Sequence, residues 1–355
     1  MQRKQQWMKR TGSVMLVLSL LVSACGKGEP DSAAQETPNQ NQMEVTEEND
    51  VQQEPVEEPE LVYPYTAPLT GKGLDEELTT RPISIMVENS PAARPQSGLH
   101  QADLVYEVLA EGEITRFIAT YQSEEAEIIG PVRSIRPYFV ELADSLDSVI
   151  VHAGWSQEAM NEMVKRGVNH LDAVYGDHPY YWRSQDRRAP HNLYTKTEQI
   201  LEGAEDRGFR KEWEQVAATY RDAQDTSQGS PATRVNMDYI AGYEVGYTYN
   251  EELEVYERIM AGKPHVDRET GTRLKAHNLL IVRAPHRITD QVGRREVDVM
   301  GPGEGYMLQQ GQMKEITWEN RGGMIRAYEN GVEVPWIPGK TWIQIVPMAS
   351  NVVIN

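Results

Sequence analysis

Between residues 80 and 210 the sequence alternates short apolar runs with amphipathic stretches, a pattern that predicts strands followed by helices. β-branched and aromatic residues dominate the runs that predict strands, at 83–87, 148–152 and 171–175, and a β-hairpin, at 102–110 and 114–121. Apolar residues at helical spacing predict helices at 138–146, at 157–166 with Ser156 as N-cap, and from a capping box at 195–198 to Gly208. Strands that alternate with short helices indicate an α/β domain.

The pattern changes beyond a polar stretch at 221–231. Short alternating runs separated by turn residues then predict strands, at 243–249, 255–260, 279–283, 295–300, 305–309, 324–328 and 341–346. Three tryptophans that alternate with apolar neighbours are expected in the core: Trp318, Trp336 and Trp342. We therefore predict an α/β domain at 61–220 that carries the candidate site, a linker at 221–232 and a mainly β domain at 233–355.

The first 25 residues have the pattern of a lipoprotein signal peptide. Four basic residues within the first ten precede a short apolar run, 14–22, which is too short to be a permanent membrane helix. Small residues follow directly before Cys25, the one cysteine of the chain, and resemble a bacterial lipobox, in which this cysteine is lipidated and becomes the N-terminus. We predict attachment to the cell membrane through lipid on Cys25, with the folded part on the extracytoplasmic face.

The next segment, residues 26–60, holds eleven acidic residues and one lysine, with almost no apolar residues. Such a composition cannot bury a core, so we predict a disordered acidic tether. The chain has a formal net charge of −19, of which residues 61–355 contribute −13. A body this acidic is not expected to bind nucleic acid, so arginines that cluster within it point either to a specific anionic ligand or to internal ion pairs.

One loop, Gly130–Tyr138, places Arg133 and Arg136 directly before the helix predicted at 138–146. The N-terminus of a helix has unpaired N–H groups and a partial positive charge, and guanidinium groups beside it favour a carboxylate, sulfate or phosphate. We therefore predict that these two arginines bind an anion.

Two later loops are expected to meet the same place. His152 lies at the predicted C-terminal end of a strand, where open α/β sheets usually bind ligands, and a loop marked by Pro190 carries Arg188 and His191. One hypothesis is an anion pocket in which a histidine gives or takes a proton. The alternative is a set of hydrogen bonds and salt bridges that fix the loops.

Glu107 is a further candidate acid or base, with Glu111 as a possible partner. Four residues along a strand span ~13 Å, too far for both carboxylates to act on one glycosidic bond. We expect one of the two to pair instead with Arg116 across the hairpin.

The remaining candidates for ligand binding are Asn89 and Arg94, in the loop after the first strand, and Trp182, in the aromatic stretch 180–182. Sugar rings stack on such aromatic surfaces, although these residues could equally cover the domain's own core. The sequence shows no P-loop, no serine elbow and no zinc-ligand spacing, so we predict no cofactor and no metal.

Nine short motifs stand out along the chain: Asn89–Pro91, Arg94–Gly98, Ala102–Glu107, Gly130–Ser134, Arg136–Pro137, Val151–Gly154, Ala189–Tyr194, Gly262–Arg268 and Thr341–Pro347. Together they resemble the YerB-like lipoprotein family of Gram-positive bacteria. The resemblance covers residues 62 to 350 and implies a surface lipoprotein with an α/β first domain and a β-rich second domain. The family has no known function, so the resemblance supplies no catalytic residues.

Two functions are consistent with these observations. The first is a lipid-anchored hydrolase or transferase that acts on peptidoglycan or another wall glycan, with the arginines holding an anion while His152 or His191 and Glu107 transfer protons. The second is a non-catalytic accessory lipoprotein that engages cell-wall polymer or an extracytoplasmic envelope protein through the same pocket. A solute-capture lipoprotein is less consistent, because such chains usually carry two similar α/β lobes.

Overall fold

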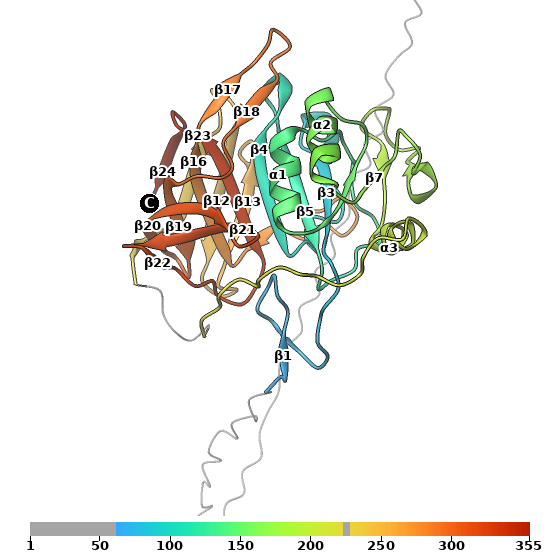
Figure 1. Cartoon of the computed structure of the whole chain (residues 1–355). Coiled ribbons are helices and arrows are strands. Elements are labelled where there is room, and N and C mark those ends of the chain that lie inside the picture. Colours follow the sequence, from blue (N-terminus) through green and yellow to red (C-terminus); the bar gives the residue numbers. More distant parts are fainter. Residues whose placement is uncertain (1–61, 223–227) are drawn as a thin grey trace, which may run out of the picture. The chain divides into compact units, whose positions relative to one another are not determined.

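A large mixed β-sheet runs through residues 62–222 and 228–355, the part of the chain that the computed structural model describes (Figure 1). Its strands are, in spatial order, β22 (Val332–Glu333), β21 (Met324–Glu329), β20 (Gln312–Arg321), β19 (Gly303–Gln309), β16 (Asn278–Ala284), β23 (Thr341–Pro347), β4 (Leu104–Leu109), β5 (Thr115–Tyr121), β3 (Ile83–Glu88), β6 (Val149–His152) and β7 (His170–Asp172), with β10 (Ser230–Pro231) beside β20. β23 lies parallel to both β16 and β4. The two regions predicted from the sequence therefore share one sheet.

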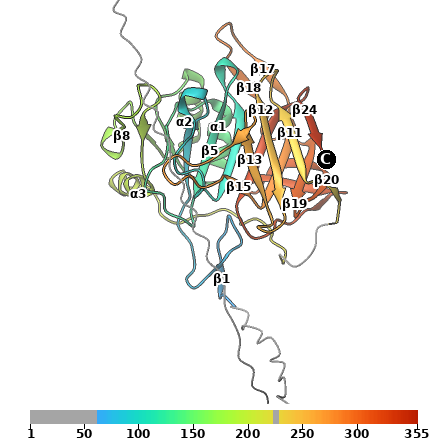
Figure 2. The same cartoon turned by 180° about the vertical axis from the view of Figure 1, so that it is seen from behind.

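A second sheet covers one face of the first (Figure 2). It consists of β14 (Lys263–Pro264), β13 (Val255–Met260), β12 (Glu244–Asn250), β11 (Arg234–Asp238) and β24 (Asn351–Ile354), with β15 (Lys275–Ala276) beside β13. Tyr247 and Tyr256 of this sheet belong to the same buried cluster as Val105, Leu279 and Trp342 of the large sheet. Alternate residues of the large sheet's strands thus face the second sheet.

The other face of the large sheet is covered by α1 (Pro137–Ser145) and α2 (Gln157–Arg166), whose apolar residues pack on Met86, Tyr106 and Ile118. α3 (Thr197–Asp206) packs through Ile200 into the opposite cluster, so the parallel strands β3, β6 and β7 are covered on both faces. The remaining short elements are β1 (Tyr65–Thr66), β2 (Gly73–Leu74), β8 (Trp182–Arg183), β9 (Leu193–Tyr194), β17 (His286–Ile288), β18 (Arg295–Val297) and the 3₁₀ turns Pro91–Ala93, Glu111–Glu113 and His178–Tyr180.

The predicted fold class, an α/β region followed by a mainly β region, is confirmed. The hairpin, the first two helices and the Ser156 cap are present, with Ser156 Oγ accepting a hydrogen bond from the Ala159 amide. The predicted capping box was wrong. The N-cap of α3 is Lys196, one residue after Thr195, and the Oγ1 of Thr195 donates to the Tyr180 carbonyl instead. The predicted signal peptide and tether lie outside the described residues.

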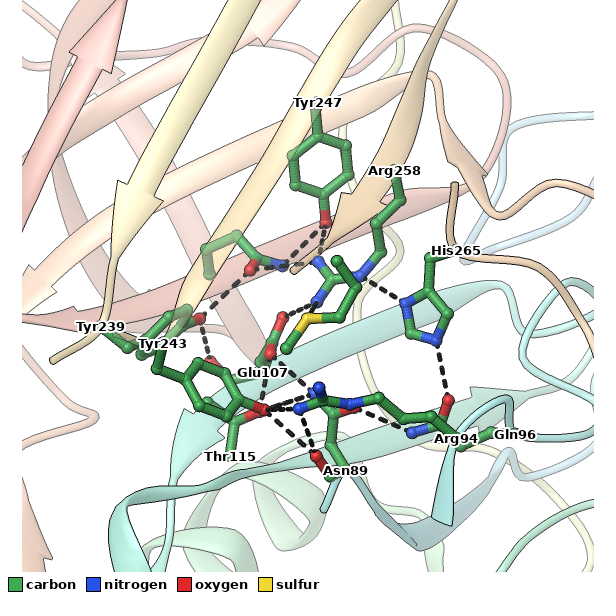
Figure 3. A network of polar contacts seen from close by, with 12 residues as sticks. Asn89, Arg94, Gln96, Glu107, Thr115, Tyr239, Tyr243, Tyr247, Arg258 and His265 are labelled. Atoms are coloured by element: carbon green, nitrogen blue, oxygen red, sulfur yellow. Dashed lines mark hydrogen bonds and ion pairs between the residues drawn. The ribbon is translucent and has the colours of Figure 1, made fainter. Parts of the chain in front are cut away.

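A buried ion pair joins the two sheets (Figure 3). Arg258 of β13 donates from Nη2 to Oε2 of Glu107 in β4 at 2.6 Å, and neither side chain is exposed to solvent. Arg258 also donates to Tyr247 Oη at 2.6 Å and to His265 Nδ1 at 3.0 Å. Burial alone lowers the pKa of Arg258, but the Glu107 carboxylate reverses this effect and holds the pKa above its ordinary value. The guanidinium is therefore charged and needs its partner.

The other groups of the network complete the pairing. Glu107 Oε1 accepts from Thr115 Oγ1 at 2.7 Å and from Asn89 Nδ2 at 3.1 Å. The Arg258 guanidinium carbon lies 4.8 Å from the ring centre of Trp342 and 5.5 Å from that of Phe117. These contacts replace the hydration that both charges lose on burial.

We predict that removing one charge of this pair destabilises the protein more than removing both. Arg258→Met leaves Glu107 buried without its cation and should lower the free energy of unfolding by about 3–5 kcal/mol. Combining it with Glu107→Leu should recover much of that loss. Urea unfolding of the full-length protein in detergent micelles, followed by tryptophan fluorescence, measures both effects.

The control is Arg287→Met, which breaks the exposed pair between Arg287 and Glu296 and should cost less than about 1 kcal/mol. An Arg258→Met protein as stable as this control would contradict the prediction.

Candidate functional site

Glu88, the last residue of β3, is the buried carboxylate on which Arg133 and His191 converge. Glu88 Oε2 lies 3.4 Å from Arg133 Nε, and His191 Nδ1 lies 3.0 and 2.9 Å from the two carboxylate oxygens. Ser90 Oγ donates to Oε1 at 2.8 Å. Glu88 is 1% exposed, whereas the side chains of Arg133 and His191 are 29% and 28% exposed. A buried carboxylate thus holds two partly exposed side chains side by side.

Backbone hydrogen bonds place the loops that carry these residues. The amide of Arg133 donates to the Met86 carbonyl of β3 at 2.9 Å, and the amide of Val132 donates to the Leu193 carbonyl at 2.7 Å. The loop at 130–136 therefore lies between the end of β3 and the segment that follows His191. The convergence expected for Arg133 and His191 is present in the structure.

This geometry leaves hydrogen-bonding groups available to a ligand. When Nδ1 of His191 donates to Glu88, Nε2 of the neutral ring can accept a proton, and the protonated ring can then donate from Nε2 to an anion. Among the described residues, neither Nε2 nor the two Nη atoms of Arg133 has a hydrogen-bond partner. Arg188 lies on the same turn, where its carbonyl accepts from the His191 amide at 3.0 Å, and its side chain is exposed without a hydrogen bond to any described residue. The site can bind an anionic group, and His191 can accept a proton.

Arg136 lies close by but pairs with a different carboxylate. It occupies the N-cap position of α1 and forms an ion pair with Glu111, which also pairs with Arg116 at 3.2 Å. The expected pairing of one hairpin glutamate with Arg116 is thereby confirmed, and that glutamate is Glu111. Burial, and then the nearby charge of Arg136, lower the pKa of Arg116 to about 10. Three guanidinium groups, those of Arg116, Arg133 and Arg136, thus pair with the carboxylates of Glu88 and Glu111.

His152 does not join this cluster. The backbone of its loop does approach, because the Ala153 amide donates to the Arg133 carbonyl at 3.0 Å. The ring, however, is fully buried, with Nε2 3.1 Å from His170 Nδ1 and Nδ1 3.1 Å from the Gly154 carbonyl. Burial, and then the proximity of His170, lower the pKa of His152 to about 3. The ring is therefore neutral and enclosed, and no substrate can reach it in this structure.

Three other predicted site residues belong to the network around the Glu107–Arg258 pair. Glu107 and Asn89 are buried within it. Arg94 is half-buried and donates to Asn89 Oδ1 at 3.0 Å and to Tyr243 Oη at 2.9 Å. Arg94 and Tyr243 also line a pocket of about 390 Å³, so of these three residues Arg94 is the one placed to meet a ligand.

The aromatic stretch at 180–182 is largely occupied by internal contacts. Tyr181 is buried and donates from Oη to the Leu171 carbonyl at 2.9 Å. Trp182 is half-buried and stacks on Tyr194, with ring centres 6.3 Å apart and planes inclined by 24°. Part of Trp182 is exposed, but this stretch does not form an open aromatic surface.

Sequence reasoning missed Glu88, Arg258 and His265 as parts of these clusters. The available signal for Glu88 was its place directly after the strand at 83–87, at the edge of the sheet where ligands usually bind. No comparable signal marks Arg258 or His265, because their partners lie far away in the sequence. Within residues 62–222 and 228–355 no group of three or more His, Cys, Asp or Glu side chains could hold a metal ion.

Comparisons with known proteins agree with this two-part organisation. Residues 69–210 match the N-terminal domain, and residues 235–343 the C-terminal domain, of the family described as "Protein of unknown function (DUF3048)". The chain is 39% identical over 296 residues to "Putative lipoprotein YerB" of Bacillus subtilis (strain 168), a match covering 81% of this chain and 88% of that protein. The crystal structure of the YerB protein from Bacillus subtilis superposes with a TM-score of 0.75 at 38% identity, over 81% of this chain and 99% of that one. The chain therefore belongs to the DUF3048 family and is a relative of the Bacillus subtilis protein YerB.

Proposed function

We propose that this chain is a lipid-anchored protein of the cell envelope that binds an anionic group of a cell-wall polymer at the Glu88 cluster, which we define as Glu88, Arg133, Arg188 and His191. The observation that carries this proposal is the convergence of Arg133 and His191 on one buried carboxylate, with nitrogen atoms of both side chains left for a ligand. An extracytoplasmic protein with an exposed anionic group would be recognised by the same chemistry.

The weak affinity expected of this site for a single anionic group is sufficient for binding a polymer that repeats such groups. A hydrogen bond to a charged group contributes about 1.5–3 kcal/mol, so a few of them bind a single anionic group only weakly. A wall polymer repeats its anionic groups, and a protein confined to the membrane surface meets them at high effective concentration. A shallow, partly exposed site is therefore sufficient for this role.

The membrane attachment is supported by the relative's name and by the sequence around Cys25. In the described part of the chain, no helix has the length and apolar character needed to cross a membrane. Lipid on Cys25 would supply the anchor, and the acidic stretch at 26–60 would separate it from the Glu88 cluster.

A catalytic role is the second candidate, and the pairing of His191 with Glu88 favours it. A carboxylate at Nδ1 orients an imidazole and fixes the tautomer in which Nε2 can accept a proton, as in many general bases. Glu107 and His152 are enclosed, so among the three predicted catalytic residues His191 alone is partly exposed. A hydrolase or transferase acting on a wall glycan would use His191 as its base and Arg133 to hold the anion.

We predict that Arg133→Gln and His191→Gln each weaken binding of purified anionic wall polymer by about 10- to 100-fold, because each removes a hydrogen bond to a charged group. Isothermal titration calorimetry of the full-length protein in detergent measures this change. Lys165→Gln and His178→Gln, at exposed residues outside the Glu88 cluster, are the matched controls and should bind as the unaltered protein does. Equal affinity in all five proteins would exclude the Glu88 cluster as the binding site.

The catalytic candidate makes a separate prediction for the same wall preparation. If the unaltered protein releases soluble fragments, His191→Gln should reduce the rate by at least about 100-fold, the typical contribution of a general base, and Glu88→Gln should also reduce it. Chromatography of the released fragments measures this rate. If the unaltered protein binds the wall preparation but releases no fragments, the catalytic role is rejected and the non-catalytic binding role stands.

We predict that Cys25→Ser moves the protein from the membrane fraction to the soluble fraction, because serine lacks the thiol to which the lipid is attached. Fractionation of cells that express each form, followed by immunoblotting, tests this. Retention of the Cys25→Ser protein in the membrane would show that another segment provides the anchor.

A further inference from the structure

Two aromatic rings lie together at the ends of neighbouring strands. Trp155 follows β6 and Tyr175 follows β7, and their ring centres are 4.3 Å apart with planes inclined by 32°. Trp155 packs on the core cluster beneath α1 and α2, whereas Tyr175 is 66% exposed and its neighbour Val174 is 55% exposed. The pair therefore presents an aromatic ring to solvent on a base that is fixed in the core.

A buried carboxylate holds both loops in place. Asp172 Oδ1 accepts hydrogen bonds from the amide of Gly154 at 2.8 Å and from the amide of Val174 at 2.9 Å. These amides directly precede Trp155 and Tyr175, so one carboxylate fixes the backbone on which each ring is mounted. The buried ring of His152 also contacts Trp155, with ring centres 6.2 Å apart and planes inclined by 73°. A ligand that stacks on the pair meets a preformed surface, which lowers the entropic cost of binding.

The aromatic pair is directly connected to the loop that carries Arg133. Ile135 forms a parallel bridge with Trp155, and the Ile135 amide donates to the Gly154 carbonyl at 3.1 Å. Ser156, the residue after Trp155, and Arg136 line a pocket of about 510 Å³, together with Arg294, Arg295 and the carboxylates of Glu158, Glu162, Asp290 and Glu296. The aromatic rings and the arginine loop are therefore adjacent along two hydrogen-bonded segments. The pocket has more carboxylates than arginines, so we place the anion at the Glu88 cluster and not in this pocket.

We propose that Trp155 and Tyr175 form a stacking platform for a sugar ring, so that the ligand of the Glu88 cluster is an anionic glycan. This inference rests on the proposed function and specifies its ligand class. The C–H face of a pyranose packs on an aromatic ring while its hydroxyl groups stay in water, and an acidic substituent of the same or the next residue would meet the arginines. The exposed patch comprises only the side chains of Trp155, Val174 and Tyr175, whereas a standard protein interface takes about 20–30 residues from each partner. A small ring is therefore a better occupant than a folded protein.

The test compares three probes on the full-length protein in detergent micelles. They are a tetrasaccharide of alternating N-acetylglucosamine and N-acetylmuramic acid, whose lactyl groups are carboxylates, the neutral tetrasaccharide of N-acetylglucosamine, and inorganic phosphate. Tyr175→Ala should weaken binding of the acidic tetrasaccharide by at least about tenfold and should change phosphate binding less than twofold. Tyr175→Phe, which keeps the ring, should bind as the unaltered protein does. Tyr65→Ala, at an exposed tyrosine in β1, is the matched control.

The outcomes separate this inference from the proposed function. If Arg133→Gln weakens binding of the acidic tetrasaccharide while Tyr175→Ala does not, the stacking platform is rejected and the anion site stands. If Tyr175→Ala weakens both tetrasaccharides while Arg133→Gln changes neither, the platform stands without the anion site. If the unaltered protein binds neither tetrasaccharide, the glycan inference is rejected whatever phosphate does. Circular dichroism confirms that each variant is folded.

Discussion

The ion pair between Glu107 and Arg258 is the interaction on which the arrangement of the two regions depends. Moving two charges out of water is costly, and a pair of this kind persists only where geometry and additional hydrogen bonds compensate. Here the compensation comes from both regions, since Asn89 and Thr115 bind the carboxylate while Tyr247 and His265 bind the guanidinium. The pair therefore forms only when both sheets are in place, and it ties the end of β3 to the second sheet.

That tie determines which side chains of β3 and its neighbours can meet a ligand. Successive residues of a strand face opposite sides of a sheet, so Asn89 turns toward the second sheet and the Glu107 network, whereas Glu88 turns toward the face of α1. Arg116, the register partner of Glu88 in β5, lies on the same face as Glu88. The network around Glu107 and Arg258 thus fixes the end of β3 on one face of the sheet. On the other face, this fixed strand end holds the Glu88 carboxylate in place for Arg133 and His191.

The local elements followed from the sequence because their signals are local. Runs of β-branched and aromatic residues located the hairpin of β4 and β5, and Ser156 located the start of α2. The pairing of β23 with β4 could not be predicted, because it joins segments that are more than 230 residues apart and whose paired residues are all buried. The loops of Arg133 and His191 could be expected to meet, from their Pro and Gly markers. The carboxylate that they share was missed, although Glu88 directly follows the predicted strand at 83–87.

One physical rule explains which candidate residues can act on a ligand. A polar side chain inside a strand that is covered on both faces cannot reach a ligand, whereas one on a loop at the end of a strand can. The strands β4 and β6 are covered on both faces, so Glu107 and His152, which they carry, must be satisfied internally and are withdrawn from solvent. Loops at the strand ends are exempt from this requirement, and His191 and Tyr175 both lie on such loops. The neutral ring of His152 packs against Trp155 and so supports the stacking platform. Backbone hydrogen bonds connect the loop of Trp155 to the loop of Arg133, so the platform and the Glu88 cluster lie on neighbouring loops at one edge of the sheet.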